Sequence, residues 1–212
     1  MRESAVLHRV KEGYTTGARS LASRSIVGLA RTRVTPNALT TAGVSLCLAA
    51  AVLVFFENRN DLLFYWVGAL VFVVGSVLDI LDGALARAGG KTTPFGSFLD
   101  STTDRVGEGA MLGAIALVFS RHGNQVALGA TIAAVAGSFL VSYTRAKAEA
   151  LGLRGDVGIG SRAERVVVIT AGLVLAPWGV LPWAIALLAA TAWFTVLQRV
   201  LHVRRELRAQ SS

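Results

Sequence analysis

The stretch Asp79-Ile-Leu-Asp-Gly-Ala-Leu-Ala-Arg87, followed after eight residues by Gly96-Ser-Phe-Leu-Asp-Ser-Thr-Thr-Asp104, gathers four carboxylates in a mostly apolar chain. Apolar runs flank this stretch, which predicts one helix ending with Asp79 and Asp82 and a second beginning with Asp100 and Asp104. Spacings of three and four residues place each pair on one helical face. Four carboxylates at one level would repel one another, and Mg²⁺, Mn²⁺ or Ca²⁺ favours such oxygen ligands. The four aspartates are therefore predicted to form a metal site.

The composition predicts a membrane protein. Of the 212 residues, 53% are hydrophobic and 16% are charged, and the mean hydropathy is +0.57. Residues 38–56 and 124–144 carry no charge, and runs of that length match the hydrocarbon thickness of a bilayer. Residues 166–198 are also uncharged but too long for one crossing, and Pro177-Trp-Gly-Val-Leu-Pro-Trp183 divides them into two spans.

We therefore expect an all-α integral membrane protein with six transmembrane helices. The expected spans are residues 38–57, 62–87, 94–120, 124–149, 162–177 and 182–203. Residues 34–205 would form the membrane domain, and residues 206–212 a tail. Residues 1–33 mix apolar and basic side chains, which favours an N-terminal juxtamembrane amphipathic helix lying in the membrane interface. Cys47 is the only cysteine, which excludes an internal disulfide.

The distribution of basic residues predicts the orientation in the membrane. With six spans, 19 of the 21 Lys and Arg residues lie on the side that also holds both termini and the aspartates. Only Arg59 and Arg121 lie on the other side. Because cytoplasmic segments carry an excess of Lys and Arg, we expect a multi-pass protein of the cell membrane with its termini and aspartates at the cytoplasmic face.

Residues beside the aspartates favour a substrate that carries phosphate. Gly83 and Gly96 lack side chains where a phosphate or nucleotide would approach the backbone, although glycine also permits tight helix packing. Arg87 supplies positive charge one turn beyond Asp82. Two metal ions can stabilise both the attacking and the leaving oxygens in a phosphoryl transfer.

The full pattern resembles the signature of the CDP-alcohol phosphotransferase (CDP-alcohol phosphatidyltransferase) family. That pattern is Asp79-x-x-Asp82-Gly83-x-x-Ala86-Arg87, eight residues, then Gly96-x-x-x-Asp100-x-x-x-Asp104. The resemblance implies a six-helix membrane enzyme, usually a homodimer, whose four aspartates bind two Mg²⁺ or Mn²⁺ ions. It implies that Asp104 also deprotonates the acceptor hydroxyl. The residues implied for CDP-diacylglycerol are Gly83, Arg87 and Gly96, with Asn37 and Thr40 at the start of the first span, where either could instead cap that helix.

A basic cluster at the same level as the aspartates predicts a second anion site. Ser142-Tyr-Thr-Arg-Ala-Lys-Ala-Glu149, with Arg162 and Arg165 further on, resembles the actinobacterial phosphatidylinositol-phosphate synthases. In those enzymes the two basic residues after the serine occur in the opposite order. By this resemblance, the acceptor phosphate would bind to Ser142, Arg145, Lys147, Arg162, Arg165 and Arg199.

The resemblance predicts transfer of a phosphatidyl group from CDP-diacylglycerol to inositol phosphate, with release of CMP. One alternative acceptor is glycerol 3-phosphate, although that branch favours Lys where this chain has Arg105. An alternative of another class is a secondary transporter, but the carboxylates cluster at one edge and no internal repeat is visible. The expected partners are the lipid bilayer and a second copy of the chain, without nucleic acid.

Overall fold

The computed structural model describes residues 35–88, 90, 92–155, 157–158 and 161–210, and within them the chain is helical with no β-strand. This confirms the predicted all-α class, while the amphipathic segment predicted for residues 1–33 lies outside the described residues. The elements are α2 (Pro36–Phe55), η1 (Glu57–Arg59), α3 (Asp61–Ala88), α4 (Pro94–Arg121), α5 (Gln125–Ala150), α6 (Arg162–Val174), η2 (Ala176–Trp178) and α7 (Leu181–Gln210).

Each of the six predicted spans coincides with one α-helix, with small differences at the ends. The break predicted around Pro177 is the 3₁₀ turn η2, which separates α6 from α7. The last helix continues to Gln210, past the expected domain boundary at residue 205.

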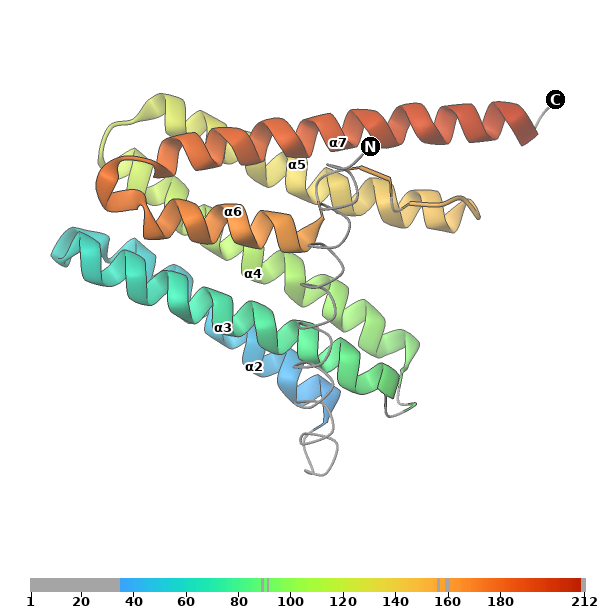
Figure 1. Cartoon of the computed structure of the whole chain (residues 1–212), viewed down its shortest axis with the longest axis horizontal. Coiled ribbons are helices and arrows are strands. Elements are labelled where there is room, and N and C mark those ends of the chain that lie inside the picture. The colour runs from blue at the N-terminus through green and yellow to red at the C-terminus, as the bar shows by residue number, and fades with distance from the viewer. Residues whose placement is uncertain (1–34, 89, 91, 156, 159–160, 211–212) are drawn as a thin grey trace, which may run out of the picture.

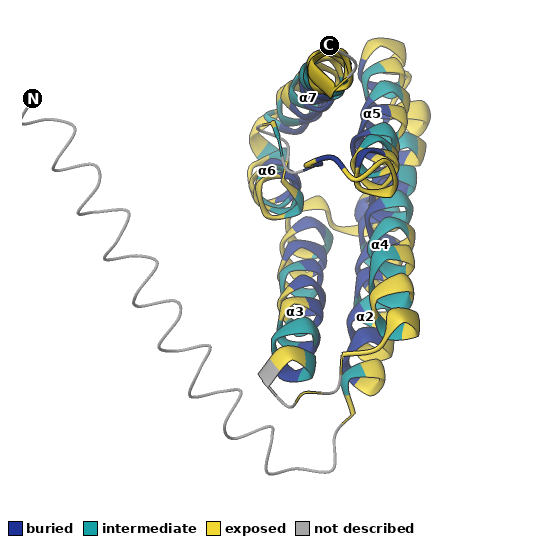
Figure 2. Cartoon of the chain, turned by 90° about the vertical axis from the view of Figure 1, so that its right-hand side faces the viewer, coloured by how far each residue is buried: buried dark blue, intermediate teal, exposed yellow. Residues whose placement is uncertain are grey.

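The helices form a ring in which each helix packs against two others (Figures 1 and 2). The order around the ring is α2, α3, α6, α7, α5 and α4. Helices α3, α6 and α7 lie on one side and α2, α4 and α5 on the other (Figure 2). Successive helices run in opposite directions, so the end of α3, the start of α4, the end of α5 and the start of α6 lie at one end of the molecule (Figure 1). This arrangement brings the predicted metal and phosphate residues to the same level.

A Thr-Pro pair begins both α2 and α4, the helices that carry many of the site residues. Thr35 caps α2 by accepting a hydrogen bond from the amide of Ala38, and Thr93 caps α4 by accepting one from the amide of Gly96. A proline occupies the first turn in each case, where a missing backbone N–H costs nothing. The Thr-Pro pairs therefore set where both helices begin.

Close glycine contacts hold α2 against α3 beside the aspartates. A Cβ atom added to Gly43 would lie 2.9 Å from the carbonyl oxygen of Gly75, and one added to Gly75 would lie 2.8 Å from that of Gly43. On the other side of α2, a Cβ atom on Gly107 of α4 would lie 3.0 Å from the Cβ atom of Cys47. Small residues thus let the three helices approach closely, as in many membrane helix pairs.

Four of the described helices are long and apolar enough to cross a bilayer: α2, residues 61–87 of α3, α5 and α7. Helix α4 carries charges through its first half, and α6 has only 13 residues. Large apolar side chains such as Leu70, Ile132 and Leu187 are more than half exposed on the outer surface. Such an exterior suits contact with lipid chains.

Candidate active site

Three of the four predicted aspartates form a compact oxygen cluster at the junction of α3 and α4. One carboxylate oxygen from each of Asp79, Asp82 and Asp100 lies within 4.8 Å of the other two. Asp79 and Asp82 are only 4% and 2% exposed, at the end of α3. The first turn of α4 is capped by Thr93, which places Asp100 opposite them. The i, i+3 spacing of Asp79 and Asp82 and the short turn before α4 thus bring three of the four predicted ligands together.

The cluster has few donors within the described residues, which fits a divalent cation. Thr40 donates a hydrogen bond to Oδ2 of Asp82, whereas the buried Oδ1 of the same carboxylate accepts none from the described protein atoms. A buried carboxylate oxygen that accepts no hydrogen bond is costly unless a cation balances it. Hard oxygen ligands of this kind suit Mg²⁺ or Mn²⁺.

Asp104 lies one turn further along α4 and is joined to the cluster through Arg162. The guanidinium of Arg162 donates to Oδ2 of Asp79, and its Nη1 lies 2.5 Å from Oδ1 of Asp104. Arg162 begins α6, where Ser161 and Glu164 form a reciprocal capping box. The cap thus fixes an arginine between two of the predicted metal ligands, a contact that sequence spacing did not indicate.

A cavity of about 460 Å³ opens beside Asp82 between α2, α3 and α4. All five residues predicted for CDP-diacylglycerol line it, and they are Asn37, Thr40, Gly83, Arg87 and Gly96. A Cβ atom at Gly83 would lie 3.3 Å from Nη1 of Arg87, and one at Gly96 would lie 3.0 Å from Oγ1 of Thr93. Side chains at either glycine would therefore crowd this cavity, hereafter the first cavity.

A second cavity, of about 440 Å³, lies on the other side of α4. It is lined by residues from α4, α5, α6 and α7, including five predicted for the acceptor phosphate: Ser142, Arg145, Arg162, Arg165 and Arg199. Asp104 also lines it. Ser97 and Asp100 line both cavities, so the two spaces meet at the carboxylate cluster.

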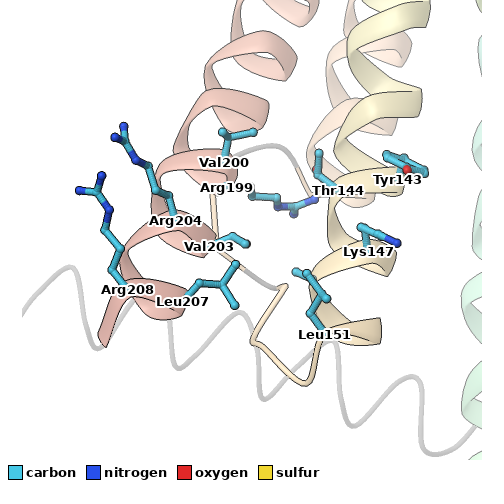
Figure 3. A pocket seen from close by; sticks show the side chains of 11 residues that line it. Tyr143, Thr144, Lys147, Leu151, Arg199, Val200, Val203, Arg204, Leu207 and Arg208 are labelled. Atoms are coloured by element: carbon cyan, nitrogen blue, oxygen red, sulfur yellow. The ribbon is translucent and has the colours of Figure 1, made fainter. Parts of the chain in front are cut away.

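Lys147 is the predicted phosphate residue that the structure does not bring to the second cavity. It lines a separate groove between α5 and α7 instead, where it projects from α5 away from Arg199 (Figure 3). The reason is helical geometry: at about 100° per residue, positions two apart point to nearly opposite faces. Because Ser142 and Arg145 face the second cavity, Lys147 faces away from it.

A buried acidic residue that the sequence analysis assigned no role holds Arg165. The Nε and Nη2 atoms of Arg165 donate to the two oxygens of Glu108 over 2.8 and 3.0 Å, and both residues are less than 10% exposed. Glu108 follows Asp104 by four residues on α4, so the spacing that grouped the aspartates also pointed to it. The pair is bidentate and therefore directional.

Arg199 is fixed by backbone groups from two other segments. Its Nε donates to the carbonyl of Val157 over 2.7 Å, and its Nη1 donates to the carbonyl of Val141 in α5. Val157 belongs to the connection between α5 and α6, so Arg199 joins three separate parts of the chain. Carbonyl oxygens are neutral acceptors, so these two hydrogen bonds orient the guanidinium without offsetting its charge.

Comparison with known proteins agrees with the geometry. Residues 33–197 match the family model of the CDP-alcohol phosphatidyltransferases. A phosphatidylinositol phosphate synthase of Streptomyces avermitilis is 39% identical over 189 residues, which cover 84% of this chain and 75% of the relative. An archaetidylinositol phosphate synthase of Pyrococcus horikoshii is 36% identical over 180 residues, which cover 84% of this chain and 88% of the relative.

Solved structures of a Mycobacterium tuberculosis phosphatidylinositol phosphate synthase share the fold. The structure with CDP-DAG bound superposes with a TM-score of 0.76 at 31% identity, covering 87% of this chain and 94% of that one. The structure in complex with manganese and citrate also has a TM-score of 0.76, at 32% identity, with 86% and 88% of the two chains covered. The chain belongs to the CDP-alcohol phosphatidyltransferase family.

Proposed function

We propose that this protein transfers a phosphatidyl group from CDP-diacylglycerol to inositol phosphate, giving phosphatidylinositol phosphate and CMP. The observation that carries the proposal is the pair of cavities that meet at Asp100. The first cavity is lined by the signature glycines and has Arg87 as its basic residue, whereas the second is lined by five arginines. Two anionic substrates can therefore meet at one carboxylate cluster.

The relatives support inositol phosphate as the acceptor. Similar enzymes of Streptomyces avermitilis and Pyrococcus horikoshii are named for phosphatidylinositol phosphate and archaetidylinositol phosphate. These two products differ in the lipid and share the inositol phosphate. Five of the six residues predicted for the acceptor phosphate line one cavity of this chain, which supports the same acceptor here.

The carboxylates of Asp79, Asp82, Asp100 and Asp104 would hold two Mg²⁺ or Mn²⁺ ions. When bound, these ions supply charge that neutralises the donor diphosphate and the CMP leaving group. The complex of the Mycobacterium tuberculosis synthase with manganese supports this choice of metal. Arg162 already balances Asp79 and Asp104 and so keeps the carboxylates close together.

The first cavity would hold the CDP part of the donor. Asn37 and Thr40 lie at the start of α2, with Thr40 hydrogen-bonded to Asp82. Gly83 and Gly96 leave room for the backbone to approach the nucleotide and diphosphate, and Arg87 offers a guanidinium to a phosphate oxygen. The Mycobacterium tuberculosis enzyme with CDP-DAG bound supports this donor.

Asp104 would act as the base, because it lines the second cavity and is joined to the carboxylate cluster through Arg162. It would take the proton of the acceptor hydroxyl, whose oxygen forms a bond to the phosphorus next to diacylglycerol. The bond from that phosphorus to the bridging oxygen breaks, and CMP leaves. Ser142, Arg145, Arg162, Arg165 and Arg199 would hold the acceptor phosphate and orient the hydroxyl toward Asp104.

We also propose that all six helices lie in the cell membrane with the active site and both termini at the cytoplasmic face. The 19 basic residues on that side support the orientation. Residues 1–33 would lie along the interface as an amphipathic segment. The charged half of α4 and the short α6 would line a polar recess below the surface, and the protein would work as a homodimer.

The test is transfer from labelled CDP-diacylglycerol by purified protein with Mg²⁺. Inositol 1-phosphate, glycerol 3-phosphate and free inositol are offered in parallel reactions. Product with inositol phosphate alone, lost on adding EDTA, supports the proposal. Product with glycerol 3-phosphate instead keeps the metal site and overturns the acceptor, whereas no release of CMP with any acceptor overturns the assignment of this reaction.

A further inference from the structure

A groove of about 540 Å³ runs between the end of α5 and the second half of α7 (Figure 3), and it borders the second cavity at Arg199, which lines both. Its floor is apolar and is formed by Leu151, which directly follows α5, and by Val200, Val203 and Leu207 of α7. Leu151, Val200 and Leu207 are each more than 40% exposed. An exposed apolar surface of this kind marks a site where another molecule binds.

The rim of the groove is basic on both sides. Lys147 stands on the α5 side, and Arg204 and Arg208 project from α7 (Figure 3). None of the described lining residues is acidic, and neither Lys147 nor Arg204 forms an ion pair with a described carboxylate. The groove therefore combines hydrocarbon contact along its floor with positive charge along its edges.

Charge decides between the possible occupants. The segment 1–33 carries seven Lys and Arg residues against two Glu, so it would be repelled by the basic rim. A second copy of the chain placed by twofold symmetry would bring the two basic rims together, which is also unfavourable. An anionic phospholipid matches both features, because it has a negative phosphate attached to apolar chains.

We propose that this groove binds one anionic phospholipid. Its phosphate lies at the basic rim, of which Lys147 forms the α5 side and Arg204 the α7 side, and an acyl chain lies along Val200, Val203 and Leu207. The site is separate from the one for the lipid donor, which lies across the ring beside α2 and α3. In this proposal Lys147, which points away from the second cavity, binds the lipid phosphate instead of the acceptor phosphate.

The test measures lipid binding rather than transfer, so its result does not depend on the proposed reaction. Delipidated full-length protein in detergent is titrated with phosphatidylglycerol or phosphatidylcholine, and bound lipid is counted by native mass spectrometry. We expect the wild type to bind one phosphatidylglycerol per chain in preference to phosphatidylcholine. Equal binding of the two lipids would overturn the proposal.

Two variants and a charge-matched control locate the site. Lys147→Gln with Arg204→Gln should weaken phosphatidylglycerol binding by about tenfold, while Arg154→Gln with Arg205→Gln removes the same charge outside the groove and should leave it intact. Val203→Trp fills the floor without changing charge and should also abolish binding. Equal loss in the control pair, or normal binding by Val203→Trp, would show only a general attraction of lipid to a basic surface and would overturn the site.

Two further outcomes count against a lipid. Displacement of phosphatidylglycerol by millimolar inorganic phosphate would show that the rim binds a free anion. If Val203→Trp instead separated a dimer in light scattering, the groove would be an interface between two copies. Persistence of the lipid in phosphate, with the oligomeric state of Val203→Trp unchanged, supports the proposal.

Discussion

The two cavities of the active site have similar volumes but obtain their charge differently. The first cavity, of about 460 Å³, has Arg87 as the basic residue among its described lining and depends on the carboxylate cluster beside it. The second, of about 440 Å³, is lined by Arg105, Arg145, Arg162, Arg165 and Arg199. The difference suggests that metal ions neutralise the donor diphosphate, whereas guanidinium groups neutralise the acceptor phosphate.

The largest expected effect is the loss of transfer when the metal ions at the carboxylate cluster are removed. Removing divalent ions with EDTA, or replacing Asp82 with Asn, should lower transfer by at least about a thousandfold, because several kcal/mol of charge stabilisation are lost. Restoring Mg²⁺ should rescue the wild type and not the variant. The measurement is CMP release, and transfer that survives EDTA would contradict the metal site.

Asp104 lies between the carboxylate cluster and the second cavity, so its replacement should lower kcat more than it weakens binding of the donor. Asp104→Asn keeps the size of the side chain and removes the base, which we expect to lower kcat by about 10² to 10⁴. CDP-diacylglycerol should still bind. Equilibrium binding of labelled donor, measured beside kcat, checks both parts, and near-normal turnover would rule out Asp104 as the base.

Replacing Arg165 tests whether the geometry of a guanidinium group, and not only its charge, is needed to bind inositol phosphate. Arg165→Lys keeps a positive charge but loses the bidentate pairing with Glu108 and should raise the KM for inositol phosphate by about tenfold to a hundredfold. The KM for CDP-diacylglycerol should change little, because Arg165 does not line the first cavity. An equal rise in both KM values would contradict the division of roles.

Glu108 should have a smaller effect in the same direction, because it acts through Arg165. Glu108→Gln keeps one acceptor oxygen for the guanidinium and removes the charge, so we expect the acceptor KM to rise by about fivefold to tenfold with little change in kcat. The double variant with Arg165→Lys should show less than the product of the single effects, since the two residues act as a pair. Multiplicative effects would indicate that Glu108 acts independently of Arg165.

The smallest expected contrast separates two neighbouring basic residues on α5. Arg145→Gln should raise the KM for inositol phosphate by about threefold to tenfold. Lys147→Gln should raise that KM by less, because only Arg145 lines the second cavity. Arg145 also pairs with Glu149 over 2.9 Å at the surface, which limits its effect. Steady-state kinetics in the same detergent checks this, and a larger effect from Lys147 would reverse the assignment.

Residues near in sequence were easier to predict than those brought together from distant helices. The carboxylate cluster and most of the first cavity come from residues 79–100, where helical spacing and one short turn decide the geometry, and residues 35–40 complete that cavity. The second cavity draws on four helices, and its residues were named by resemblance. Lys147 shows the limit of position-by-position transfer, since a helical spacing of two residues already placed it on the opposite face from Arg145.

The sequence by itself determined the six helices, the apolar character of four of them and the convergence of three aspartates, because hydrophobic runs, Thr-Pro caps and helical spacings are local properties. Tertiary structure decided which distant groups meet. Arg162 reaches Asp79 and Asp104, Glu108 holds Arg165, and carbonyls of Val141 and Val157 hold Arg199. These contacts depend on how the helices close into a ring, with α6 packed against α3 and α7 against α5. Side-chain packing between distant segments sets that order, and no local pattern encodes it.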